Sequence, residues 1–174
     1  MLTVVGPDGK AKWSVSKDSE AGDWKLAAAG KFDTGKAQDA ASALYGLRIA
    51  DAAAGVSDAD AGLDKATLIR ATTFEGWTYE VGIGKPAPGA RHYVKTSVTG
   101  TVPEARTPAA DEKPENKEKN DKAFAERKEL LAAKLAREKA VAGQAVLVES
   151  ASVAPLLRDR SALLTVEKPK RARK

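Results

Sequence analysis

The segment TLIRATTFEGWTYEVGIGKPAPGARHYVK, residues 67–95, decides the fold. Residues 67–74 are rich in β-branched and aromatic side chains, which favours a strand. After a tight turn at 75–76, every second residue is apolar: Trp77, Tyr79, Val81 and Ile83. This period of two is typical of a strand with one buried face, so the two runs predict an antiparallel hairpin. A further turn leads to residues 91–98, which predict the next strand.

The glycines and the single histidine of this segment resemble parts of functional sites. A phosphate-binding loop has four residues between its first glycine and the Gly-Lys pair, and it opens a helix. Gly82, Gly84 and Lys85 are spaced too closely, and Pro86 follows at once. His92 has no second histidine and no cysteine with which to bind zinc, and the chain has no G-x-S-x-G turn. We therefore interpret the glycines as turn residues and expect no catalytic or cofactor-binding residue.

The chain before this segment alternates in a similar way. Three short strands are predicted there: residues 2–5, 11–16 and 24–28. Residues 34–45 instead repeat alanine, leucine and tyrosine at helical spacing, and Asp33 or Thr34 can cap that helix. Residues 51–64 are rich in alanine and aspartate, and we expect a connection without regular structure.

The second half of the chain is more highly charged. Residues 103–120 contain three prolines and few large apolar side chains, which predicts a linker or a solvated loop. Residues 121–143, capped by the aspartate at their start, predict a long charged helix that ends at a glycine. Residues 145–148 predict a short strand, and Ser150 or Ser152 can cap a final helix.

Together these patterns predict an α+β protein. We expect a twisted antiparallel sheet of short hairpin-linked strands, with helices packed on one face and a charged helical insertion. The predicted division has four parts: a sheet and helix core at 1–102, a charged linker and long helix at 103–143, a final strand and helix at 144–166, and a basic disordered tail at 167–174.

The composition excludes several classes of site. The 174 residues include no cysteine, so a disulfide scaffold, a thiolate zinc site and a cysteine nucleophile are excluded. Asp58 and Asp60 resemble the start of a calcium loop, but its closing position holds Ile69 and not glutamate. No metal site is therefore predicted. No run approaches the roughly 18 apolar residues of a membrane span, and the start MLTVVGPDGK lacks the features of a signal peptide.

The positive charge of the chain lies at its end. The net charge is +5, and the last seven residues, KPKRARK, carry five basic side chains and no acid. The rest of the chain has 24 basic and 24 acidic residues, so its net charge is zero. Because the basic character belongs to a tail and not to a surface, a nucleic-acid partner is not expected. The alternative is a binder of polyanions or nucleic acid that acts through this tail.

Two features leave alternatives open. The helix at 121–143 is either a charged helix that rests one edge on the domain or an arm that pairs with a partner helix. The candidate partner-contacting residues are Phe124, Leu131, Leu135, Lys168, Lys170, Arg171, Arg173 and Lys174. The three tryptophans are predicted to pack in the core, with a carbohydrate-stacking surface as the alternative if two of them are exposed on one face.

The order and spacing of short motifs also resemble a known family. The motifs are W-S-V at 13–15, W-K-L at 24–26, G-L-D-K at 62–65, F-E-G-W-T-Y-E-V-G-I-G at 74–84, a Tyr-Val pair at 93–94, D-E-K-P-E-N-K at 111–117 and A-P-L-L-R-D-R-S-A-L-L at 154–164. Over residues 12–168 the chain resembles the bacterial family called domain of unknown function 4340, in the branch with a charged helix. That branch has an aromatic strand where this chain has residues 144–147, so this edge is expected to pack more weakly.

The resemblance implies a place in the cell but no chemistry. Such domains are typically extracytoplasmic parts of bacterial envelope proteins with an N-terminal membrane anchor, and they often accompany ABC-type transport or gliding-motility-like components. The resemblance therefore implies a non-enzymatic envelope binding or scaffolding module with a protein partner in a membrane-associated complex. This chain has no anchor, so we expect a domain of a longer protein or a variant without the anchor, which would be cytoplasmic if complete. A hydrolase that uses unpaired acids is a third hypothesis, and the oligomeric state is left open.

Overall fold

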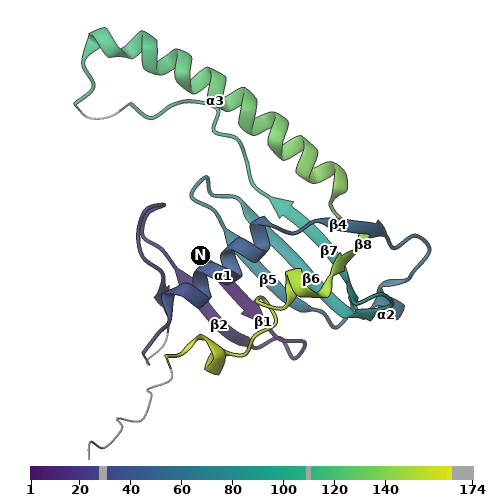
Figure 1. Ribbon diagram of the computed structural model, residues 1–174. Coiled ribbons are helices and arrows are strands. Elements are labelled where there is room, and N and C mark those ends of the chain that lie inside the picture. Colours follow the sequence, from purple (N-terminus) through teal and green to yellow (C-terminus); the bar gives the residue numbers. More distant parts are fainter. Residues whose placement is uncertain (28–30, 109–110, 166–174) are drawn as a thin grey trace, which may run out of the picture.

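The computed structural model describes residues 1–27, 31–108 and 111–165. In these residues eight strands form one antiparallel sheet with the order β3-β2-β1-β5-β6-β7-β8-β4 (Figure 1). The strands are β1 (Leu2–Val5), β2 (Ala11–Ser16), β3 (Lys25–Leu26), β4 (Ile49–Ala52), β5 (Thr67–Thr72), β6 (Thr78–Ala87), β7 (Arg91–Thr99) and β8 (Ala145–Glu149). The helices are α1 (Thr34–Tyr45), α2 (Asp58–Ala61), α3 (Pro114–Val141), α4 (Ser150–Val153) and the short 3₁₀ helix η1 (Arg160–Leu163). The predicted α+β class is confirmed.

The two central hairpins are present as predicted. β5 pairs with β6, and β6 pairs with β7, in antiparallel register. In the first turn Gly76 has a φ of 81°, which a glycine adopts without the strain that a side chain would add. Because side chains alternate along a strand, Ile69, Val81 and Val94 fall on the same face. Each is at most 4% exposed there, so this face holds the core.

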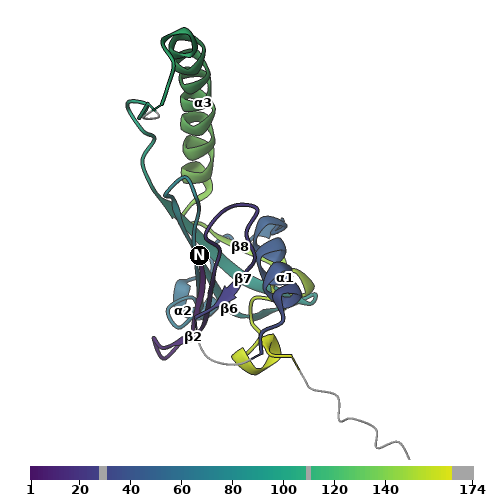
Figure 2. The same cartoon turned by 90° about the vertical axis from the view of Figure 1, so that its left-hand side faces the viewer.

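The core lies between this face and a layer made by α1, α4 and η1 (Figure 2). Asp33 caps α1, since its carboxylate accepts hydrogen bonds from the backbone N–H groups of Gly35 and Lys36. Ala37 and Ala40 are fully buried, and such small side chains let the helix lie close to the sheet. The chain end completes the layer with three buried side chains: Val153, Leu156 and Leu163.

The opposite face carries the short helix α2 (Figure 2). Ile83 points into the core, so its neighbour Gly84 faces the other way, where a Cβ would run into the backbone carbonyl of Ala61. Gly84 is thus a strand residue that allows close approach of α2. Gly82 also lies within β6, so our interpretation of these two glycines as turn residues was wrong. The connection expected at 51–64 also holds the second half of β4 and the whole of α2. All four residues of β4 are exposed, so the sequence has no alternation of apolar and polar residues that would predict this edge strand.

The longest helix, α3, is inserted between the neighbouring strands β7 and β8 and projects beyond the sheet (Figures 1 and 2). It begins at Pro114, well before the start predicted at Asp121. Proline fits the first helical position, and Glu115 lies in the first turn, where it suits the helix dipole. The linker predicted at 103–120 is therefore wrong from Pro114 onward, where the highly charged segment is helical.

The end of α3 nearest the sheet is held by a second, small apolar cluster. Its buried members are Trp77, Val98 and Leu135. The Trp77 indole N–H donates to the carbonyl oxygen of Thr101 at 3.0 Å, and the Lys134 ammonium lies 5.4 Å from the centre of the indole ring. Leu135 is the one residue of α3 that is buried. The helix therefore touches the sheet through a short stretch near its C-terminal end.

Farther from the sheet, an ionic network ties α3 to the segment that leads into it. The Arg106 guanidinium donates to both carboxylate oxygens of Glu112, at 2.7 and 2.9 Å, and to the Asp121 carboxylate. The side chains of Arg106 and Glu112 are only 17% and 10% exposed. These hydrogen bonds keep the pKa of Glu112 below its ordinary value, so its charge persists into acid.

The end of the described chain differs from the single final helix that was predicted. α4 ends at Val153, and the 3₁₀ helix η1 follows only at Arg160. Pro155 stands between them and has no N–H to continue the helical hydrogen bonds. Leu156 and Leu163 lie on either side of this irregular stretch, and both are fully buried in the core.

Candidate functional site

The core face of the sheet is covered at two places and left open between them. α1 and the chain end cover one side, and the sheet-proximal end of α3 covers the other. Between them lies a hollow of about 480 Å³. Its floor is formed by side chains of strands β5 to β8: Ala71, Tyr79, Val81, Val94, Thr96 and Val146. Its walls are Leu44, Leu47 and Ile49 on one side and Lys134, Glu138 and Val141 on the other.

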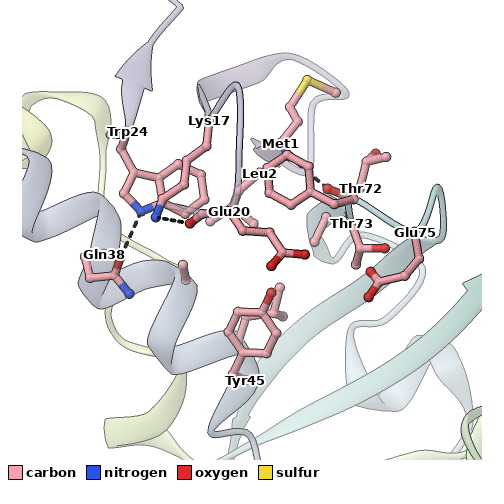
Figure 3. A pocket seen from close by; sticks show the side chains of 14 residues that line it. Met1, Leu2, Lys17, Glu20, Trp24, Gln38, Tyr45, Thr72, Thr73 and Glu75 are labelled. Carbon is pink, nitrogen blue, oxygen red and sulfur yellow. Dashed lines mark hydrogen bonds between the residues drawn. The ribbon is translucent and has the colours of Figure 1, made fainter. Parts of the chain in front are cut away.

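A second hollow, of about 340 Å³, lies beside the second half of α1 (Figure 3). Its lining includes Trp24 and Gln38 on one side and Phe74 on the other. The two hollows share five lining residues: Leu44, Tyr45, Ala71, Thr73 and Glu75. They therefore form one continuous groove, which we call the sheet groove.

The rim of the sheet groove is unusually apolar for a protein surface. Six large hydrophobic residues of the described chain are strongly exposed: Met1 (57%), Tyr45 (86%), Ile49 (58%), Phe74 (54%), Leu130 (72%) and Val141 (47%). All of them except Leu130 line the groove. Tyr45 belongs to both hollows and is the most exposed, so it forms a ridge between them.

Polar groups at the Trp24 end are mostly engaged with one another. The Trp24 indole N–H donates to the side-chain oxygen of Gln38 at 3.1 Å. The Lys17 ammonium lies 5.2 Å from the centre of the Trp24 ring and donates to the Glu20 carbonyl oxygen. In Figure 3 the Tyr45 hydroxyl and the Glu20 carboxylate point toward each other across the hollow. This end of the groove thus combines aromatic walls with a few polar atoms.

The ionisable side chains that line the groove balance in sign. The acids are Glu20, Glu75 and Glu138, and the bases are Lys17, Arg48 and Lys134. Hydrogen bonds from its own backbone N–H and from the Thr73 side chain lower the pKa of Glu75, and Lys134 adds to this. Burial, with the nearby Glu138 and Glu75 charges, raises the pKa of Tyr79, so its hydroxyl stays protonated. The groove is therefore apolar in its floor and electrically mixed at its edge.

The described residues that line the groove include no histidine and no cysteine. Elsewhere, His92 Nδ1 and Ser150 Oγ are 2.8 Å apart, a contact that sequence reasoning did not foresee. Burial lowers the pKa of His92, so the ring is neutral at neutral pH. Neither residue lines either hollow of the groove. Within residues 1–27, 31–108 and 111–165, no group of three or more histidine or acidic residues could hold a metal ion.

The apolar residues predicted on the long helix face their own chain. Leu135 is buried against Trp77, and Leu131 packs partly buried against the same cluster. Phe124 is half-buried and lies beside the segment that leads into the helix. A role for these three residues in partner contact stays a prediction, as does the role of Lys168, Lys170, Arg171, Arg173 and Lys174, which lie outside the described residues.

The tryptophans do not form a carbohydrate-stacking surface. Trp13 and Trp77 are 3% and 1% exposed, and each indole N–H donates to a backbone carbonyl. Only Trp24 is partly exposed. Core packing is thus confirmed for two of the three, and the alternative that needed two exposed tryptophans is wrong.

Comparison with models of known protein families, with curated proteins and with solved structures finds no match. The resemblance to the domain of unknown function 4340 therefore stays a prediction. In the part of the chain that the structure describes, no helix has the length and apolar character needed to cross a membrane.

Proposed function

We propose that this protein is a non-enzymatic binding or scaffolding module and that the sheet groove is its contact surface for a protein partner. The observation that carries the proposal is the position of the exposed apolar side chains: five of the six border this groove. Apolar side chains gathered on one part of a surface mark interaction sites more often than single ones do.

The shape of the apolar surface favours a polypeptide over a small molecule. A small ligand on the groove floor would leave Tyr45, Phe74 and Val141 on the rim in water. A partner surface laid across the groove would cover the floor and the rim together, and burial of both contributes to binding. The family resemblance supports the further proposal that this module acts in the bacterial envelope, beside an ABC-type transport or motility-like membrane complex.

Photo-crosslinking in cells tests the proposed surface. A photoreactive amino acid in place of Tyr45 should form an adduct with another polypeptide. The same amino acid in place of Lys65, an exposed residue that follows α2 and does not line the groove, is the matched control and should form none. Failure of the Tyr45 position to give an adduct above the Lys65 level would refute the sheet groove as a partner surface.

The basic tail supports a second candidate function, because residues 168–174 carry the whole net charge of the protein. A polyanion binder should bind heparin in a way that weakens steeply with salt, and it should lose this binding when residues 167–174 are deleted. The truncated protein should keep its Tyr45 adduct if the groove is the functional surface. Loss of that adduct on truncation would favour the tail.

A further inference from the structure

We infer that the partner seated on the sheet groove is a second copy of this chain, paired about a two-fold axis. The inference rests on the proposed function of the groove and names its partner. It is carried by three features of the surface: its mixed charge, its combination of a ridge with two hollows, and the blocked edge of the sheet nearby.

The charges at the rim argue against a partner of one sign. Lys17 stands three residues from Glu20, and Lys134 stands one helical turn from Glu138. A polyanion, an anionic membrane or a strongly basic peptide would meet repulsion here as often as attraction. The N-terminal amine also lies at this rim, where burial lowers its pKa. The surface therefore suits a partner that is apolar at its centre and mixed in charge at its edge.

The sheet groove itself fits that description. A two-fold interface joins the same patch on both subunits, so the patch must be complementary to itself. Outside the last seven residues the acidic and basic residues are equal in number, so the net charge of +5 belongs to those seven residues and the rest of the chain has no net charge with which to repel a second copy.

The shape of the sheet groove is also complementary to itself. Tyr45 is an exposed ridge, and a hollow lies on each side of it. In a two-fold pair the Tyr45 of each copy can enter the hollow of the other that Trp24 and Phe74 border. Tyrosine is enriched among the residues that dominate binding energy, because its ring buries a large apolar area and its hydroxyl keeps a polar contact.

Pairing of two copies through the neighbouring sheet edge is obstructed. The backbone N–H of Ala53 donates to Ala145 in β8, so the N–H of Ala52 points away from the sheet. The Asp51 carboxylate accepts that hydrogen bond at 2.8 Å. The donor that an added strand would need is thus occupied, and a negative charge stands at the edge. Face contact through the groove is the mode that remains at this end of the sheet.

The test is the mass of the intact protein by sedimentation equilibrium across a range of concentrations. The unsubstituted protein should be a dimer that dissociates on dilution. Tyr45→Ala should raise its dissociation constant by about 30-fold or more, the effect of removing a dominant interface residue. Leu130→Ala removes an almost equally exposed side chain from α3, away from the groove, and should leave the constant unchanged.

Circular dichroism and thermal unfolding of each variant check that a change in mass does not reflect loss of fold. Cross-linking from position 45 supplies an independent reading, since the adduct should have twice the mass of the chain. A protein that stays monomeric at every concentration, or a dimer that Tyr45→Ala leaves intact, overturns the inference. A monomer whose position 45 crosslinks to a different polypeptide overturns the inference alone, and a monomer without any adduct overturns the proposed function too.

Discussion

The sheet core and the projecting helix α3 are stabilised in different ways. The core cluster contains fourteen buried residues from strands, α1 and the chain end. The cluster beneath α3 contains three, of which only Leu135 comes from the helix, although α3 is 28 residues long. Beyond this contact α3 is tied down by the charged network around Arg106.

This difference predicts that the two regions unfold separately. Apolar burial is the main driving force of folding, so the core should unfold as one cooperative unit. A helix with one buried residue gains little from burial and should open locally at a smaller free-energy cost. The sheet groove lies on the border between the two regions, and opening of α3 would change one of its walls.

The largest expected effect separates a core residue from an exposed residue of α3. Ile69 lies in the central strand β5 and is fully buried, so Ile69→Ala should lower the free energy of unfolding by about 2–5 kcal/mol. Leu130 is 72% exposed, so Leu130→Ala should change it by less than about 0.5 kcal/mol. Urea unfolding followed by circular dichroism measures both. Similar losses in the two variants would show that α3 belongs to the same cooperative unit.

The next effect concerns the contact between the two regions. Leu135→Ala should cost about 2 kcal/mol, at the low end for a buried leucine because the groove borders the site. Amide protons of α3 should then exchange about 30-fold faster, since each 1.4 kcal/mol corresponds to tenfold. Amides of β5 and β6 should keep their protection. Hydrogen exchange by NMR measures this, and equal acceleration in the sheet would contradict separate unfolding.

The sequence predicted the core better than the helix because only the core has a strong period. Alternation in β5 to β7 and the alanine spacing of α1 reflect burial on one face, and burial is what these patterns record. α3 buries one residue, so its apolar pattern is faint, and its start was predicted from Asp121 and not from Pro114. The edge strand β4 has no buried side chain, so its sequence shows no alternation of apolar and polar residues.

The sheet groove was not predicted, for a related reason. Tyr45 continues the apolar stripe of α1 and was counted with it, yet Gly46 ends the helix and leaves the ring 86% exposed. Whether an apolar residue at the end of a stripe is covered depends on what lies beside it in space. Here α3 stops short of covering it, and that geometry is set by residues almost a hundred positions away.

A smaller effect tests the charged network. Arg106→Ala removes a guanidinium that both oxygens of Glu112 and the Asp121 carboxylate share. The segment before α3 should then be cleaved several-fold faster by a protease that cuts after glutamate, at Glu104 or Glu112, which both variants keep. Arg106→Lys keeps the charge but not the forked geometry, and it should give an intermediate rate. Unchanged cleavage in both variants would show that the network does not restrain this region.

The smallest effects distinguish the two regions by pH. Burial lowers the pKa of His92 in the folded protein beneath its ordinary value of 6.5. In the pH window between 6.5 and this lower pKa, the unfolded chain therefore binds more protons than the folded one. Stability of the sheet should therefore fall as the pH drops through this window. His92→Gln should reduce the difference in urea midpoint between pH 6.5 and more acidic solution, a range that lies below the ordinary pKa of the buried N-terminal amine. A variant with the same pH dependence as the unsubstituted protein would assign it to another group.

The projecting helix should respond to acid in a lower window. The pKa of Glu112 lies below its ordinary value of 4.5, chiefly because Arg106 donates to its carboxylate. Its stabilising contribution is complete above that value and is lost as the pH falls through the folded pKa. Hydrogen exchange of α3 should thus change only well below the pH at which His92 weakens the sheet. If both regions lost protection in one step, the sheet and α3 would be a single unit in spite of their different contacts.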